Sequence, residues 1–137
     1  MKTSARNELA GKIVDIKSGT VVSEVKVEVS KDIIVSATIT NESKENLGLK
    51  VGEDISVLIK SSSIILANGD LKTSARNNIV GTIKEVIKGA VNSEVIICVG
   101  DNTLCAVITN ESVEGLGLKA GSSVNAIFKA SSVILIA

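Results

Sequence analysis

A serine and an arginine recur at matching places in the pentapeptide TSARN, which begins at residue 3 and again at residue 73. In an extended segment, side chains two residues apart point to the same side, so Ser4 and Arg6 would face one spot. Ser74 and Arg76 repeat the arrangement. A hydroxyl beside a guanidinium fork donates several hydrogen bonds in a fixed geometry, which suits a small oxyanion. The alternative is that each arginine pairs with a surface glutamate and each serine caps a turn.

Two further hydroxyl pairs stand at the expected start of a short helix. Thr40 and Ser43 are three residues apart, and Thr109 and Ser112 repeat them. The free N–H groups of a helix start favour anions, so these hydroxyls are candidate ligands. Ordinary N-capping of the helix is the alternative.

A lysine ends an apolar segment in each half of the chain. Lys60 is followed by Ser61, whereas Lys129 is followed by Ala130, so the serine hydroxyl is not shared. An ammonium group beside hydroxyls and backbone amides is another anion ligand, and a charge that protects a strand edge is the alternative. Ser23 and Ser93 open two Ser-Glu-Val triplets, for which we expect a tight turn with exposed amides.

Composition excludes several classes of function. The chain has 15 basic and 15 acidic residues, no histidine and one aromatic residue, Phe128. Acid–base and triad chemistry therefore have almost no candidates, and we expect no enzyme. Balanced charge and a lack of stacking rings argue against nucleic-acid binding. The shared polar set consists of donors and cations, which predicts recognition of a small dianion without turnover.

The chain is a tandem repeat. The halves align at an offset of 70, which becomes 69 after a one-residue deletion near residues 31–32. We expect one domain at 1–67, a linker at 68–71 and a second domain at 72–137. Cys98 and Cys105 occur in the second half only, opposite Glu28 and Val35, and we expect them to be reduced thiols packed on strands.

Each repeat is predicted to be mostly β. Val25, Val27 and Val29 alternate with Lys26 and Glu28, and the chain then turns at residues 31–32. "GKIVDIKSG" predicts the first strand and "DISVLIK" a later one, and "SIILA" should close the same repeat. A short helix between residues 41 and 52 would be capped by Thr40 or Asn41 and packed by Leu47 and Leu49. Strands with one short helix between the third and fourth are the layout of an OB-like barrel.

So small a unit buries little surface, and we therefore expect an oligomer. No apolar run is long enough for a membrane span, and nothing resembling a signal peptide precedes the first repeat, so we expect a cytoplasmic protein.

The blocks TSARN, ITNES…LGLK and IKSSSIILA together resemble the Mop domain, the molybdate-binding module of the molbindins. Two copies in one chain are similar to the tandem, di-Mop type. The resemblance implies OB-like barrels, a trimer with six modules, and molybdate or tungstate bound at interfaces between modules. It implies oxyanion ligands at Ser4, Arg6, Thr40, Ser43, Lys60, Ser61, Ser74, Arg76, Thr109, Ser112 and Lys129. A second type of site would use amides near Ser23 and Ser93. The expected role is storage and homeostasis of the oxyanion, with no organic cofactor and no protein atom bound directly to the metal.

Donor-only sites suit molybdate, a full dianion at neutral pH, better than partly protonated phosphate, whose proton would lack an acceptor. Two other functions stay open. One is an OB-fold binder of single-stranded nucleic acid, and the other is a structural β-barrel that only assembles.

Overall fold

The computed structural model describes residues 3–137, so Met1 and Lys2 lie outside the described residues. The elements of the first repeat are β1 (Asn7–Ser18), β2 (Val22–Ser30), β3 (Ile33–Thr40), α1 (Asn41–Leu47), β4 (Asp54–Ile59), the 3-10 turn η1 (Ser61–Ser63) and β5 (Ile65–Ala67). Those of the second are β6 (Asn77–Lys88), β7 (Asn92–Val99), β8 (Asn102–Thr109), α2 (Asn110–Leu116), β9 (Ser123–Phe128), η2 (Ala130–Ser132) and β10 (Val133–Ile136). The prediction of mostly β structure with one short helix per repeat is confirmed.

The alternation of apolar and polar residues places the core. Val25 and Val27 on β2 are fully buried, whereas Glu28 between Val27 and Val29 is exposed. β4 buries Ile55, and it also buries Leu58, which points to the opposite face of the strand. The predicted faces of β2 and β4 are therefore confirmed.

The two sheets exchange their last strands. One five-stranded sheet has the order β10-β4-β1-β2-β3, and the other has the order β5-β9-β6-β7-β8. The C-terminal strand of the second repeat thus completes the sheet of the first, with Val133 paired to Ile59. The prediction that "SIILA" closes its own repeat is wrong, because β5 pairs with β9 across the repeat boundary.

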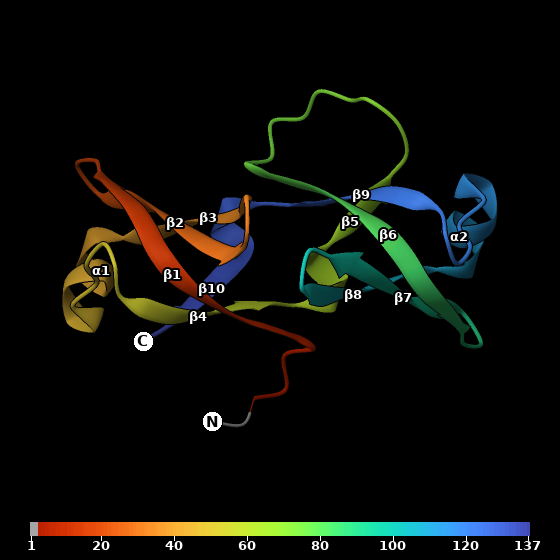
Figure 1. The fold of residues 1–137 in the computed structure, drawn as a ribbon, viewed down its shortest axis with the longest axis horizontal. Coiled ribbons are helices and arrows are strands. Elements are labelled where there is room, and N and C mark those ends of the chain that lie inside the picture. Colours follow the sequence, from red (N-terminus) through yellow and green to blue (C-terminus); the bar gives the residue numbers. More distant parts are fainter. Residues whose placement is uncertain (1–2) are drawn as a thin grey trace.

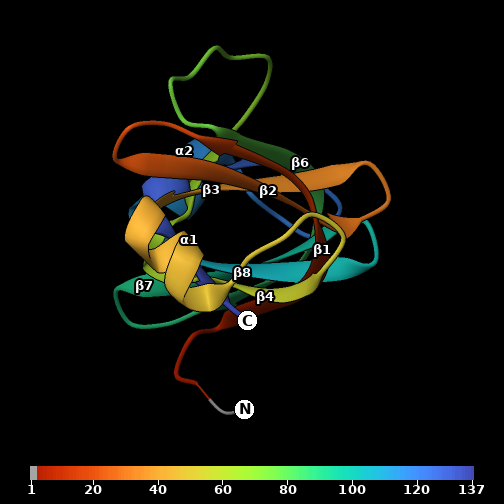
Figure 2. The same ribbon diagram turned by 90° about the vertical axis from the view of Figure 1, so that its left-hand side faces the viewer.

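The sheets form two lobes that lie side by side along the long axis of the molecule (Figure 1). Each lobe carries one helix at its outer end, and the segments that follow β4 and β9 cross between the lobes. Seen along the long axis, the strands curl around a core, with α1 at the near end (Figure 2). The two predicted OB-like barrels are therefore present as two curled half-barrel sheets that exchange a strand.

The short helices begin and end where the sequence predicts. Thr40 caps α1, and Gly48 ends it in the left-handed conformation at φ 63°, which glycine adopts without the steric cost of a side chain. Leu49 then packs into the core at 9% exposure. Leu47 is 38% exposed, so the prediction that it also packs the helix down is wrong.

The one-residue deletion between the repeats falls in the turn after the second strand. β2 and β3 are joined through Lys31 and Asp32, which has a positive φ of 63°, whereas the second hairpin turns at Gly100. The offset is therefore already 69 along β8, where Ala106 pairs with Val95 as Ala37 pairs with Val25. The counterpart of Cys105 is thus Ser36, and the alignment with Val35 is wrong.

Among the described residues, no helix is long and apolar enough to cross a membrane.

Candidate oxyanion site

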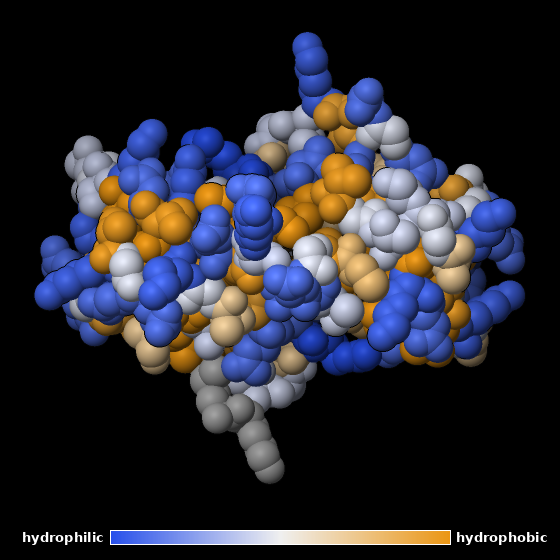
Figure 3. Space-filling model, viewed as in Figure 1, coloured by the Kyte–Doolittle hydropathy of each residue, from blue (hydrophilic) through white to orange (hydrophobic). Residues whose placement is uncertain are grey.

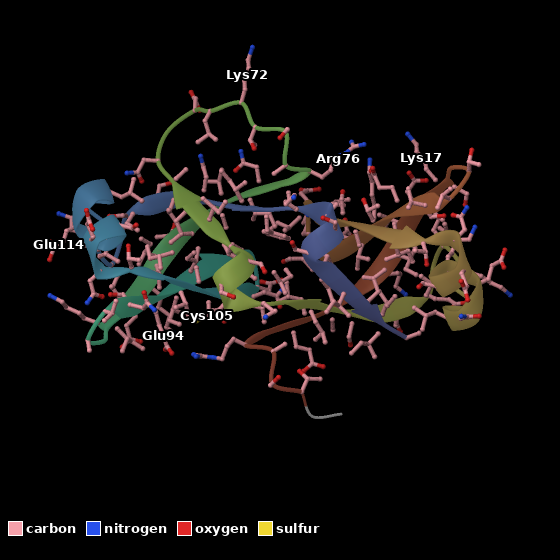
Figure 4. The ribbon with its side chains drawn as sticks, turned by 180° about the vertical axis from the view of Figure 1, so that it is seen from behind. Lys17, Lys72, Arg76, Glu94, Cys105 and Glu114 are labelled. Carbon is pink, nitrogen blue, oxygen red and sulfur yellow. The ribbon has the colours of Figure 1, made fainter. Side chains whose placement is uncertain are left out.

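The two arginines of the TSARN blocks form ion pairs with the opposite repeat. Arg6 binds Glu94 with both ends of its guanidinium fork, Nη1 to Oε1 at 2.7 Å and Nη2 to Oε2 at 3.2 Å. Arg76 makes the matching contact with Glu24, Nη2 to Oε2 at 3.0 Å. Figure 4 shows Arg76 and Glu94, one partner of each pair, on opposite edges of the molecule. The alternative in which each arginine pairs with a surface glutamate is therefore the arrangement seen here.

The Arg6–Glu94 pair shifts the titration of both groups. The hydrogen bond from Arg6 lowers the pKa of Glu94 below its usual range, because it stabilises the charged carboxylate. The same hydrogen bond raises the pKa of Arg6. Both groups are therefore charged at neutral pH, and Arg6 carries a full positive charge toward the second repeat.

The asparagine that ends each TSARN block is a buried clamp between the repeats. The Asn7 carboxamide donates from Nδ2 to the Cys105 carbonyl at 2.9 Å and accepts from the Cys105 N–H at 2.7 Å. Asn77 makes the same two bonds with Ser36. Sequence reasoning missed this role for Asn7 and Asn77, although both lie inside the repeated block. It also missed Glu24 and Glu94, whose recurrence in Ser-Glu-Val was the available signal.

The predicted lysines stand beside the arginine segments. β1 and β4 are antiparallel with Asn7 opposite Ile59, so the backbone of Arg6 lies next to that of Lys60. In the second repeat, Asn77 lies opposite Phe128, which places Arg76 next to Lys129. Each repeat therefore brings its TSARN block and its lysine to one corner.

One of these corners is a hollow of about 440 Å³ in which Ser74 and Lys129 meet. Its other polar residues are hydroxyl-bearing, and its apolar lining includes Phe128. The full lining is Ser62, Ser63, Ile65, Thr73, Ser74, Ala75, Ile127, Phe128, Lys129 and Ser132. Ser62 and Ser63 come from the first repeat, so both repeats build this corner. None of these residues is acidic, which suits an anion.

The helix-start hydroxyls act as caps. Thr40 Oγ1 accepts from the Ser43 N–H at 3.0 Å and lies 2.9 Å from the Ser43 hydroxyl. Thr109 and Ser112 repeat this geometry at α2. The capping alternative therefore describes these residues here, and all four side chains remain at the surface or partly so.

Ser23 and Ser93 are buried in strands. Each is 1% exposed and donates its hydroxyl hydrogen bond to the asparagine at the start of the nearby helix, Asn41 or Asn110. The expected tight turn at Ser-Glu-Val is wrong, because the triplet lies in β2 and β7 and the turn precedes it. Ser93 borders a hollow of about 280 Å³ that Lys88 also lines, but the carboxylate of Glu94 lines it as well, which disfavours an oxyanion there.

The structure separates the predicted ligands of one repeat into two groups. Arg6 and Lys60 stand at the start of β1, whereas Thr40 lies beyond its far end, where Ser18 pairs with Ser23 and Val22 pairs with Thr40. The 12 residues of β1 measure roughly 40 Å along the strand at ~3.3 Å per residue. A site that uses both groups would therefore have to draw them from different modules.

The larger hollow of about 660 Å³ is a poor anion site. It is lined near Lys12 by two carboxylates, Glu28 and Asp54, and contains no residue of the predicted set. Lys12 is itself within 3.4 Å of Asp54. The carboxylates would repel an oxyanion, so we expect no oxyanion in this hollow.

Other chemistry has little support. Among residues 3–137, no group of three or more histidine, cysteine, aspartate or glutamate side chains is placed to hold a metal ion. Cys98 and Cys105 are free thiols, as expected. Burial raises the pKa of Cys105, so this thiol is protonated and unreactive at neutral pH.

The family follows from comparison with known sequences. A family model described as the TOBE domain matches residues 3–66 and again residues 73–135. The chain belongs to the TOBE domain family. Its two TOBE domains cover nearly the whole chain, and the resemblance to tandem Mop proteins is confirmed by relatives that carry that name.

Curated relatives of this chain carry names that refer to molybdenum. "Molybdenum transport protein ModE" of Azotobacter vinelandii is 41% identical over 98% of this chain and 51% of its own length. "Molybdenum-pterin-binding protein MopA" of Rhodobacter capsulatus is 37% identical over 98% of this chain and 52% of its own. The chain thus spans about half the length of these curated relatives.

A solved structure matches both TOBE domains together. The cytoplasmic molybdate-binding protein ModG, in a crystal form with molybdate bound, superposes with a TM-score of 0.94. It is 36% identical, and the match covers 98% of each chain. The arrangement of two intertwined half-barrels is therefore shared with ModG.

Proposed function

We propose that this protein binds molybdate, and tungstate as its close analogue, for storage and homeostasis in the cytoplasm. The observation that carries the proposal is the hollow in which Ser74 and Lys129 meet among hydroxyl groups without a carboxylate. A site made of donors and one cation matches a dianion that carries no proton. ModG, which has the same fold along its whole length and binds molybdate, supports the choice of anion.

We further infer that the full site is completed by association of chains, with a trimer of six modules as the expected assembly. The separation of Lys60 from Thr40 supports this inference, since one repeat does not bring both groups together. Exposed apolar side chains supply surface for association (Figure 3). They include matched pairs from the two repeats, Val21 with Val91 and Ile65 with Ile134, at 55–70% exposure.

The remaining ligands in the proposed set keep the roles that the resemblance implies. Ser4, Arg6, Lys60 and Ser61 would serve the corner of the first repeat, and Arg76 would join Ser74 and Lys129 in the second. The cap residues Thr40, Ser43, Thr109 and Ser112 would face these corners from a neighbouring module. We propose modules at 1–67 and 72–137 as the functional units, acting by binding rather than catalysis and without nucleic acid.

One observation favours a second function. The ModE relative is matched over 98% of this chain but only 51% of its own length. In a protein of that architecture, the same module would report molybdate to a second part of the polypeptide. The mass of the natural polypeptide in its own cells distinguishes the two functions, because the second function requires a polypeptide longer than these 137 residues.

Equilibrium dialysis with molybdate, followed by elemental analysis of molybdenum, tests the proposal. We expect saturable binding by the wild type and weaker binding by Lys129→Met, which removes the charge and keeps the length of the side chain. Lys84→Met removes an exposed lysine from β6 outside the site and should bind like the wild type. Absence of saturable binding by the wild type would refute the proposed function.

A further inference from the structure

We propose that Glu94 and Glu24 set the anion affinity of the protein by competing with the oxyanion for Arg6 and Arg76. This inference rests on the proposed function, because it concerns the same anion sites. Each glutamate is contributed by the repeat opposite its arginine, so each acts as an internal anion across the boundary between the lobes.

The contacts show that the carboxylate occupies the part of the arginine that an oxyanion would use. Glu94 accepts from both Nη1 and Nη2 of Arg6, which is the paired geometry that a guanidinium also offers to a tetrahedral oxyanion. An anion that takes this fork must therefore displace Glu94. The displaced carboxylate regains water, since its side chain is already 34% exposed.

The strand register brings the backbone of Arg6 close to the proposed anion ligand Lys60. The backbone of Arg6 lies beside that of Lys60, whose side chain points to solvent at an exposed corner. The Arg6 guanidinium is directed instead to Glu94 on the other repeat. An anion held at Lys60 and Ser4 would thus draw Arg6 from one partner to another without any change in the backbone of β1.

The two arginines are held unequally. Arg6 makes two hydrogen bonds to Glu94 and is 48% exposed, whereas Arg76 contacts Glu24 through Nη2 and is 65% exposed. Glu24 also lies 4.0 Å from Lys26, which shares its charge. Competition at Arg6 is therefore the stronger, and the two anion corners of one chain should differ in affinity.

The test is isothermal titration of the full-length protein with molybdate. Glu94→Gln keeps the size of the side chain but removes the charge that holds Arg6. We expect molybdate to bind about two- to fivefold more tightly, the range typical of an exposed ion pair. Glu24→Gln should give a smaller gain, and Glu94→Asp, which keeps the charge, should return the affinity toward that of the wild type.

The matched control is Glu85→Gln, which removes the same charge from an exposed position on β6, the strand beside β7. Glu85 takes part in none of the ion pairs among residues 3–137. The molybdate affinity of the Glu85→Gln variant should therefore stay within the error of the wild-type value. The proposal that Glu94 competes with the anion would be overturned if Glu94→Gln bound molybdate only as tightly as Glu85→Gln. Weaker binding by Glu94→Gln than by the wild type would also overturn it. If the wild type bound no molybdate, the proposed function itself would be refuted. The titration of the wild type alone distinguishes this outcome from failure of the competition.

Discussion

The carboxamide of Asn77 makes both backbone hydrogen bonds with Ser36, each at 2.8 Å, in the interior between the two repeats. In this way a side chain of β6 continues the hydrogen-bonding edge of β3. Asn7 does the same for Cys105, so the pentapeptide TSARN holds each repeat to the other through its last residue and its arginine. The pentapeptide therefore recurs in both repeats at least because its residues hold the two lobes together.

Replacing Asn77 with alanine should destabilise the protein. The substitution leaves the N–H and carbonyl of Ser36 without their partners in a buried place, and an orphaned buried group costs about 1–3 kcal/mol. Asn78→Ala, at the exposed neighbouring position on β6, should have little effect. Urea unfolding measures both, and equal stability of the two variants would contradict the clamp.

The exchanged strands should make the two repeats unfold as one unit. β10 completes the sheet of the first repeat and β5 that of the second, so neither sheet is intact without the other. We expect a single calorimetric transition whose van't Hoff and calorimetric enthalpies agree. Leu135→Ala, which removes a buried side chain from β10, should lower this one transition by about 2–5 kcal/mol of stability without splitting it. Two resolved transitions would disprove the coupling.

The Arg6–Glu94 pair should make stability depend on pH in the acid range. The pKa of Glu94 is lowered in the folded state, so the pair stabilises the protein above the unfolded pKa of a glutamate. This contribution is lost as the pH falls through the lower, folded pKa. We therefore expect the wild type to melt above Glu94→Gln at pH 7, with the difference shrinking as the pH falls below the unfolded pKa of a glutamate. A difference that stays constant from pH 7 to pH 3 would argue against the pair.

Loss of the helix cap at Thr109 should lower the stability of the protein measurably, and a serine at the same position should restore it. Thr109 Oγ1 accepts from the Ser112 N–H at 3.1 Å, and removal of such a cap costs about 0.5–2 kcal/mol. Thr109→Ala should lose this much in chemical denaturation, and Thr109→Ser should recover most of it. Molybdate titration of the same pair tests the proposed ligand role, because a cap alone would leave the affinity unchanged in both.

Much of the fold was predictable because the local sequence patterns agreed with the burial and the element boundaries seen in the structure. Val25 and Val27 alternate with polar neighbours, and Gly48 marks the end of a helix that Thr40 starts. The strand exchange was not predictable, since Ile65 and Ile134 carry the same alternating pattern whichever sheet they join. Their partner is decided by the direction in which the chain leaves η1 and η2, which no local pattern encodes.

The candidate site was only partly predictable, for a similar reason. Matching residue types drew attention to Ser74 and Lys129, which the structure brings to one hollow. The glutamates that hold Arg6 and Arg76 lie 88 and 52 residues away in sequence (94 − 6 and 76 − 24), so spacing carried no sign of the pairing. The buried role of Asn7 was not predictable either. From sequence alone an asparagine is expected at the surface, and the backbone groups that its carboxamide bonds are known only from the structure.

Native mass spectrometry of the unliganded protein, titrated with molybdate and in parallel with sulfate, tests whether associated chains bind the oxyanion selectively. We expect a trimer that gains molybdate in saturable steps and gains little sulfate at the same concentration. A chain that stays monomeric and takes up neither anion, or both equally, would contradict it.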